Sequence, residues 1–277
     1  MASRLRASRL PLALVAPLLL AAAPLQLTAE EEARFPAEEA NQGVASGERV
    51  FWAIGNQEIG KYDARTGERL AHWQGDPERF PHLNSCELAG EKLVCASSNY
   101  PATPMASELV WFDAATLTLE RIDPLGHGHG SLTWFARHDG ASWACYANYD
   151  GKGGEKGRDH RATTLVRMDD HLRETGIWTF PDTVLARFAP RSSSGGSWGA
   201  DGLLYVSGHD ARELYAMRVP ENGKVLEHVA TIATPTGGQA IAIDQDEPDV
   251  LWSIERKTRD VVRSRLPEVA VASISQD

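Results

Sequence analysis

The sequence predicts an all-β fold, a β-propeller of five blades, each a sheet of four antiparallel strands. Three observations predict it. Five segments of the 277-residue chain share one order of parts. Their starts lie about 40–45 residues apart, with one longer interval, which is the period of a propeller blade. No long stretch has the 3.6-residue periodicity of an amphipathic helix.

Each segment opens with a small polar or glycine-rich stretch that leads into a short apolar strand. A second strand, a polar tip, a third strand and an outer strand follow. The five units begin at residues 41–45, 82–88, 129–135, 194–202 and 237–243. One unit alone would expose a hydrophobic face, and stacking in a ring buries it. A two-sheet sandwich is the alternative, and a sixth blade would form if residues 30–40 paired with the extreme C-terminus.

The first residues are typical of a secretory signal peptide rather than of the propeller. Three arginines precede a short apolar run that is interrupted by proline, and acidic residues follow it. We predict a signal peptide over 1–29 with cleavage near Ala23 or Ala29, a linker over 30–40, and a single propeller domain over 41–277. The protein would then be exported, to the periplasm or the extracellular space. An uncleaved membrane anchor is the alternative.

The charge of the chain argues against two classes of partner. The formal net charge is −10, and removal of the three arginines of the signal peptide makes it −13. Such a surface repels nucleic acid and anionic membranes. The expected partner is therefore a small polar or anionic molecule, with no nucleic acid and no membrane after signal cleavage.

Two of the three cysteines are predicted to form a disulfide. In "NSCELAGEKLVCASS", a two-residue turn with glycine first, at Gly90, would place Cys86 opposite Cys95. That pair falls at a non-hydrogen-bonded position, with Cα atoms roughly 4.5 Å apart, which is within disulfide range. Two buried thiols are the alternative. Cys145 is left over and is expected to be a buried thiol.

Several stretches resemble known propeller groups. The third strands that end in "YDARTGERL" and "FDAATLTLE" resemble the repeats of secreted bacterial propellers of the YncE and quinoprotein-like group. "GADGLLYVSGHD" is similar to the gluconolactonase and NHL-repeat type, and "NQGVA" resembles the opening of the five-bladed plant-type glutaminyl cyclases. The resemblance is architectural. The gluconolactonase type would further imply one divalent metal, and the cyclase type a cyclase activity.

The predicted topology brings polar residues together at one mouth of the ring. In a propeller the innermost strand begins at the top face, and the loop between the second and third strands returns to that face. Loops held on such a scaffold commonly carry binding and catalytic groups. The blade starts contribute Gln42, His82, Asn84, His129, Ser131, Ser194 and Gln239. The tips contribute Asn56, Asn99, Asp150, His209, Asp210, Glu255 and Arg256. The asparagines and aspartates among them are also ordinary turn residues.

Residue chemistry assigns expected roles within this ring. His209 or His82 would act as a general base. Carboxylate oxygens suit Ca²⁺, and the predicted metal ligands are Asp150, Asp210 and Glu255. The predicted ligand-binding residues are Gln42, Asn84, Asn99, Ser131, Gln239 and Arg256.

A glycine-rich insert at 151–162 carries four basic residues, which suggests a mobile lid over an anionic ligand, with a solvated loop as the alternative. The sequence therefore predicts an exported propeller that binds a small polar or anionic ligand in a central pocket of its top face. The alternative is a hydrolase, lactonase or cyclase that depends on a calcium-type divalent cation and acts on a small metabolite. Fold cannot choose between the two, because propellers host both.

Overall fold

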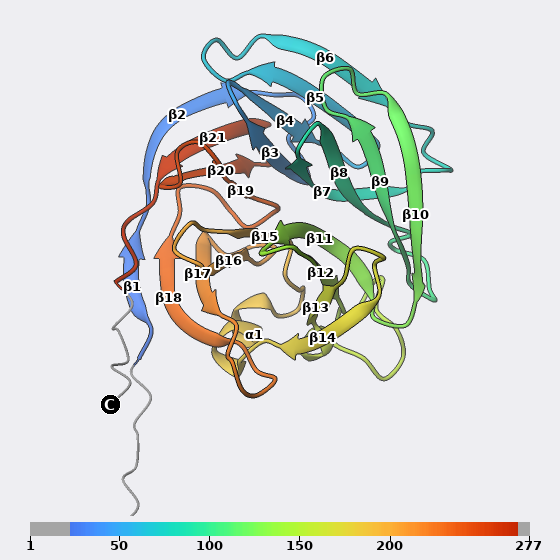
Figure 1. The fold of residues 1–277 in the computed structure, drawn as a ribbon, viewed down its shortest axis with the longest axis vertical. Helices are drawn as coiled ribbons and strands as arrows, with labels where there is room; N and C mark the ends of the chain where they lie inside the picture. Colours follow the sequence, from blue (N-terminus) through green and yellow to red (C-terminus); the bar gives the residue numbers. More distant parts are fainter. Residues whose placement is uncertain (1–22, 271–277) are drawn as a thin grey trace, which may run out of the picture.

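A computed structural model describes residues 23–270 of the chain, which form five sheets arranged in a ring around a central axis (Figure 1). The protein is a five-bladed β-propeller, and each blade contains four antiparallel strands, as predicted. Within the described residues no helix is long and apolar enough to cross a membrane.

The blades follow one another along the chain, and each blade has its first strand innermost. Blade 1 consists of β3 (Gly43–Gly47), β4 (Val50–Ile54), β5 (Glu58–Asp63) and β6 (Arg69–Gln74). Blade 2 consists of β7 (His82–Ala89), β8 (Lys92–Ser98), β9 (Ala106–Asp113) and β10 (Leu119–His127). Blade 3 consists of β11 (Ser131–His138), β12 (Ala141–Ala147), β13 (Thr164–Met168) and β14 (Glu174–Thr179). Blade 4 consists of β15 (Gly195–Trp198), β16 (Leu204–Ser207), β17 (Glu213–Arg218) and β18 (Glu227–Ala233).

Blade 5 takes strands from both ends of the described chain. The C-terminal part contributes β19 (Ala242–Ile243), β20 (Val250–Glu255) and β21 (Asp260–Arg265). The N-terminal strand β2 (Glu30–Pro36) pairs antiparallel with β21 and completes the sheet (Figure 1). Residues 30–36, predicted as part of a linker, are therefore a strand of the fifth blade and do not start a sixth. The pairing fastens the two ends of the ring, because an incomplete blade would expose the edge of β21.

A further short strand, β1 (Leu25–Thr28), pairs in parallel with β18 on the outside of blade 4. The end of the predicted signal peptide thus lies within the described structure, and Ala29, which follows β1, is buried. Residues 1–22 of that predicted segment lie outside the described residues.

The core is divided among the interfaces between blades. Within the described residues, buried apolar side chains form five clusters, and each cluster joins two neighbouring blades. Sheets in a ring diverge toward the outside, so bulky rings fill the widening space. Trp73 of blade 1 meets Phe112 of blade 2 edge to face, with ring centroids 4.8 Å apart.

Small residues at the blade starts let the innermost strands approach one another near the axis. A Cβ added at Gly43 would lie 2.4 Å from Cβ of Ala240. One added at Gly195 would lie 2.6 Å from Cα of the same alanine. Blades 1, 4 and 5 therefore meet at a spacing that larger side chains could not occupy. These contacts account for the glycines at the starts of the first and fourth sequence units.

The predicted hairpin and disulfide are present in blade 2. Gly90 has a φ of +63°, and Cys86 pairs with Cys95 in the register expected from a two-residue turn. The two cysteines form a disulfide with Cα atoms 4.0 Å apart. Cys145 is buried with a free thiol, and burial raises the pKa of that thiol to about 12.

The chain forms two short helices that the sequence patterns did not predict, one within blade 3 and one between blades 3 and 4. The 3₁₀ helix η1 (His160–Ala162) ends the 151–162 insert, and α1 (Asp182–Phe188) follows blade 3. In α1, Val184, Leu185 and Phe188 pack into the cluster between these blades. A seven-residue helix is too short to give a clear periodic signal.

Candidate functional site

The top face has a pocket of about 390 Å³ at the mouth of the central channel, which we name the central pocket. All five sequence units contribute to it, as the predicted convergence of blade starts and tips requires. Its lining consists of Gln42, Asn56, Pro81, His82, Asn84, Tyr100, Pro101, Thr133, Tyr149, Arg191, Ser194, His209, Gln239 and Arg256. The lining includes two arginines and two histidines and no carboxylate.

The two arginines come from different blades. Arg256 follows β20, and its guanidinium lies 3.4 Å from Oδ1 of Asn41 and 3.4 Å from Nε2 of His209. Arg191 follows α1, and its backbone N–H donates to the carbonyl of Phe188. Within residues 23–270 neither guanidinium forms an ion pair with a carboxylate. Burial lowers the pKa of Arg256, which means that its charge is incompletely solvated, although the nearby carboxylate of Asp210 acts in the opposite direction.

Both predicted bases line the central pocket, and burial keeps both largely neutral near pH 7. Burial lowers the pKa of His82 to about 4. The pKa of His209 is also lowered by burial, although its hydrogen bond to Asp210 acts in the opposite direction. Nδ1 of His209 lies 2.7 Å from Oδ1 of Asp210. A proton on Nδ1 would donate to that carboxylate and leave Nε2 to accept from Arg256.

Three predicted ligand-binding amides line the central pocket and also tie parts of the ring together. Nε2 of Gln42 donates to Oδ1 of Asn56 at 2.6 Å, which joins the start and the tip of blade 1. Nε2 of Gln239 donates to the carbonyl of His209 at 3.2 Å, from blade 5 to blade 4. Nδ2 of Asn84 donates to the carbonyl of Leu132 at 2.6 Å, from blade 2 to blade 3. The positions of these amides are therefore fixed before any ligand binds.

Two other predicted ligand-binding residues lie outside the lining. Ser131 is fully buried, and its hydroxyl donates to Oγ of Ser98 at 2.8 Å. Asn99 organises its own loop, because its side chain accepts from the N–H of Ala106 and donates to the carbonyl of Pro104. Asn99 thus has the turn role that its residue type also allowed.

The three predicted metal ligands do not come together. Glu255 forms an ion pair with Arg212 at 2.6 Å, and Asp210 is bound to His209. Asp150 accepts hydrogen bonds from the backbone N–H and from the ring of His160. Among the described residues, the group with metal-ligand spacing is instead Asp150 with Asp159 and His160. Each of the three carboxylates is held by a cationic or hydrogen-bonding neighbour, which for Glu255 and Asp150 lies well apart in the sequence.

Sequence reasoning missed three residues of the lining, two aromatic and one basic. Tyr100 and Tyr149 follow the second strands of blades 2 and 3. A signal for both was present, because each follows an asparagine in "SSNYP" and "ANYD". Arg191 had no such signal, because it lies between α1 and β15, outside the repeated parts of the units.

The 151–162 insert packs beside the central pocket, but its basic side chains do not line it. Arg161 pairs with Asp159, and Arg158 lies 3.7 Å from Glu155. Glu155 in turn accepts the backbone N–H of Met105 at 2.7 Å and so fastens the insert to blade 2. The basic lid expected from the sequence is thus a tethered loop whose arginines are paired within it.

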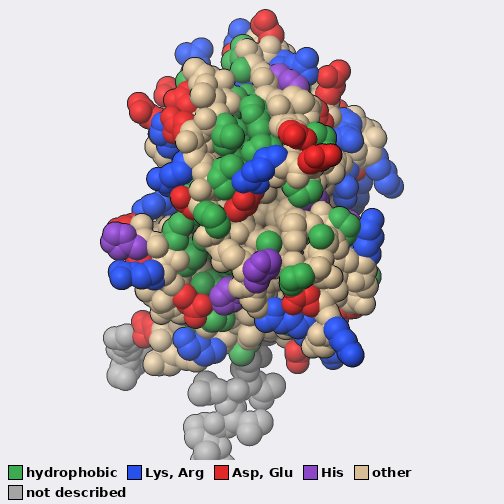
Figure 2. Space-filling model, turned by 90° about the vertical axis from the view of Figure 1, so that its right-hand side faces the viewer, with side chains coloured by type: hydrophobic (Ala, Val, Ile, Leu, Met, Phe, Trp, Pro, Cys, Tyr) green, Lys and Arg blue, Asp and Glu red, His purple; other side chains and the backbone are tan. Residues whose placement is uncertain are grey.

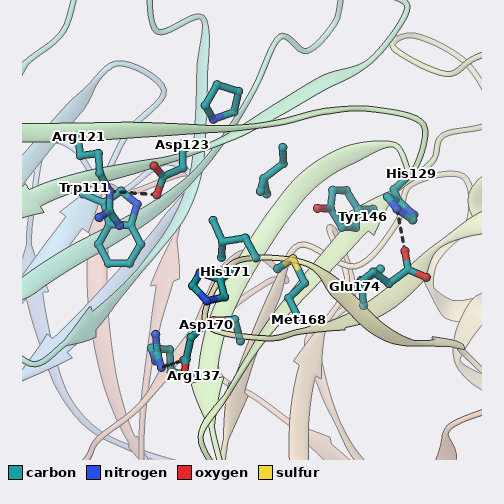
Figure 3. Close-up of a pocket in the computed structure, with 15 residues that line it drawn as sticks. Trp111, Arg121, Asp123, His129, Arg137, Tyr146, Met168, Asp170, His171 and Glu174 are labelled. Carbon is teal, nitrogen blue, oxygen red and sulfur yellow. Dashed lines mark hydrogen bonds and ion pairs between the residues drawn. The ribbon is translucent and has the colours of Figure 1, made fainter.

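A larger hollow of about 560 Å³ lies on the outer side of the ring between blades 2 and 3, and we name it the side pocket (Figure 3). Its charged groups are paired: Arg121 with Asp123 at 3.0 Å, Arg137 with Asp170, and His129 with Glu174 at 3.3 Å. Figure 2 shows this side of the molecule, where basic and acidic side chains are interspersed. Both arginines of the side pocket therefore have a carboxylate partner, unlike those of the central pocket.

Comparison with solved structures supports the propeller architecture of the chain. The chain is similar to the PQQ-bound aldose sugar dehydrogenase from Streptomyces coelicolor, with a TM-score of 0.54 and 16% identity over 91% of this chain and 85% of that one. It is also similar to a glucose dehydrogenase, with a TM-score of 0.50 and 9% identity over 86% of this chain and 100% of that one. No family model matches the sequence, and no curated protein matches it. At these identities the likeness establishes a propeller of the same general architecture as these enzymes, and the chemistry rests on the pocket itself.

Proposed function

We propose that the protein binds a small organic anion in the central pocket. The observation that carries the proposal is the pair Arg191 and Arg256, two guanidinium groups in a lining that contains no carboxylate. A guanidinium matches a carboxylate in shape and charge and can donate two parallel hydrogen bonds to it. A bound anion would supply the counter-charge that both side chains lack.

The contrast with the rest of the protein supports this assignment. The chain is acidic overall, and most arginines elsewhere in the described part form ion pairs with carboxylates, as Arg212 and Arg218 do with glutamate. A desolvated cation without a partner costs stability, so its presence in a pocket favours a ligand-binding role. The fixed amides Gln42, Asn84 and Gln239 would add orientation through their remaining hydrogen-bonding atoms.

Binding can be tested with four probes: acetate, benzoate, cyclohexanecarboxylate and inorganic phosphate. Each is titrated into the purified protein by calorimetry and added at millimolar concentration in thermal melting. A bound anion at 100 times its Kd stabilises the folded state by about 2.7 kcal/mol. We expect at least one anion to bind and to raise the melting temperature.

The double variant Arg191→Met with Arg256→Met should lose both effects. A matched control is Arg218→Met, which removes an arginine outside the lining that pairs with Glu227, and it should bind as the wild type does. If none of the four anions binds the wild-type protein, the proposal fails.

A specific observation favours a second candidate function, catalysis on the bound anion. His82 lines the pocket with a ring that is neutral at pH 7, so a ring nitrogen is free to accept a proton, and its pKa of about 4 makes it a weaker base than an ordinary histidine. In that case His82→Gln would lower kcat for the ester or lactone of the anion far more than it raises KM. A His82→Gln variant that loses affinity and turnover together would argue for a binding role alone.

A further inference from the structure

Three aromatic rings form a continuous surface on one side of the central pocket. The ring of Tyr100 lies between those of His82 and Tyr149, with centroid distances of 5.0 and 5.3 Å. Their interplanar angles are 40° and 66°, so the rings meet in tilted and edge-to-face contacts. We name these three residues the aromatic wall.

The aromatic wall is not part of the hydrophobic core. None of its members belongs to the five clusters of buried residues, whereas Tyr146, three positions before Tyr149, does. All three side chains line the pocket and keep part of their surface exposed. Core packing therefore does not explain them, and their free faces are available to a ligand.

The wall is held in place from behind by the 151–162 insert. Gly153, with a φ of +83°, packs so closely that an added Cβ would lie 2.3 Å from Cε2 of Tyr100. Glu155 anchors the same loop to the N–H of Met105, on the loop that carries Tyr100. Rings fixed in this way lose little conformational freedom when a ligand stacks on them.

The pocket thus has two chemically different sides. The wall comes from blades 2 and 3, and His209 and Arg256 come from blades 4 and 5. Arg191 lies between these two groups, because Pro190, which precedes it, accepts the backbone N–H of Asp150, the neighbour of Tyr149. In a five-membered ring these two pairs of blades face each other across the axis (Figure 1). A ligand that used both sides would carry its negative charge at one end and a flat apolar surface at the other.

We infer that the anion bound by the central pocket is a planar cyclic carboxylate, with its ring stacked on the aromatic wall and its carboxylate on Arg191 and Arg256. The inference rests on the proposed anion-binding function and narrows its ligand class. A volume of about 390 Å³ lies within the range of small-molecule sites. The wall discriminates by shape, because only a flat ring can contact the ring faces over its whole area.

The test compares benzoate with cyclohexanecarboxylate, which has the same charge and number of heavy atoms but a puckered ring. Calorimetric titration of the wild-type protein should give a Kd for benzoate about fivefold lower, since aromatic pairs contribute on the order of 0.5–1.5 kcal/mol beyond their buried area. Tyr100→Leu should bring the two Kd values together, whereas Tyr100→Phe, which keeps the ring, should preserve the preference.

The outcomes separate this inference from the function on which it rests. Equal affinities for the two carboxylates in the wild-type protein, or a benzoate preference that survives Tyr100→Leu, would overturn the planar-ring inference and leave anion binding intact. Absence of binding by all four anions would overturn the proposed function itself. Thermal melting of each variant without ligand confirms that it is folded. If Tyr100→Leu does not fold, the test uses Tyr100→Phe, which should keep the benzoate preference of the wild type.

Discussion

Nε2 of His209 lies 3.4 Å from Nη1 of Arg256, so the tips of blades 4 and 5 meet inside the central pocket. His209 in turn contacts Asp210, whose side chain is exposed to solvent. The guanidinium of Arg256 therefore has a neutral ring and an amide oxygen as its nearest polar neighbours, and no carboxylate.

Replacement of Arg256 by methionine should stabilise the protein in the absence of ligand or leave its stability unchanged. The change removes a desolvated, unpaired charge and keeps a side chain of similar length. The opposite is expected for Arg212→Met, because that change leaves the largely buried carboxylate of Glu255 without its partner. Urea unfolding of both variants, with no organic anion in the buffer, measures the two effects. A large loss of stability in Arg256→Met would contradict the view that this arginine is kept for ligand binding.

The stability of the protein should fall as the pH is lowered from about 6.5 to about 4, in part because of His82. Its pKa is lowered to about 4 in the folded state, whereas the unfolded side chain titrates near 6.5. Between these values the unfolded state binds more protons, so acid favours unfolding. The full contribution is on the order of 3 kcal/mol at 1.36 kcal/mol for each pKa unit. Urea unfolding at several pH values should show a shallower acid slope in His82→Gln, and an unchanged slope would refute the assignment.

Removal of β2 should open the ring. A chain that starts at Ala37 lacks the fourth strand of blade 5, and with it Phe35, whose ring contacts those of Phe51 and Trp252 at 5.5 and 6.1 Å. We expect this chain to lose its cooperative thermal transition or to self-associate through the exposed edge of β21. A chain that starts at Glu30 keeps β2 and should still melt cooperatively. Calorimetry and size-exclusion chromatography distinguish these results, and similar melting of both chains would show that β2 is dispensable.

The disulfide between Cys86 and Cys95 should stabilise blade 2. Closing a loop of this length lowers the entropy of the unfolded chain, worth about 2–3 kcal/mol. The variant with Cys86→Ala and Cys95→Ala should therefore melt at a lower temperature than the oxidised wild-type protein. Adding a reductant should lower the melting temperature of the wild type and not that of the variant. Equal melting temperatures for the oxidised wild type and the variant would count against a stabilising bridge.

Gly153→Ala should weaken the preference for benzoate over cyclohexanecarboxylate, although residue 153 does not line the central pocket. The added methyl group meets the ring of Tyr100 from behind and also occupies a backbone conformation that favours glycine. We expect a smaller ratio between the Kd values of cyclohexanecarboxylate and benzoate. Gly157→Ala is a matched control, because it has a similar φ of +86° in the same loop and nothing within 4 Å of its added Cβ. The same loss of preference in both variants would point to general disturbance of the loop.

The sequence determined the parts of this protein that depend on neighbours along the chain. Alternating apolar residues and turns at a regular spacing set the hairpins, and five repeats of them set five blades. The glycine of one two-residue turn set the register that pairs Cys86 with Cys95. Because blade starts and tips return to one face, the convergence of Gln42, His82, His209, Gln239 and Arg256 also followed from the repeat.

The tertiary structure alone decided which polar groups are free and which are paired. Glu255 has the residue type of a metal ligand, but Arg212, 43 positions earlier in the chain, reaches it from the next blade. Arg191 enters the pocket from a segment outside the repeat, and β2 closes a blade whose other strands are more than 200 residues away. A repeat pattern describes local hydrogen bonding and the alternation of side chains. The pairing of two side chains depends on distances between distant segments, and those are fixed only when the ring is closed.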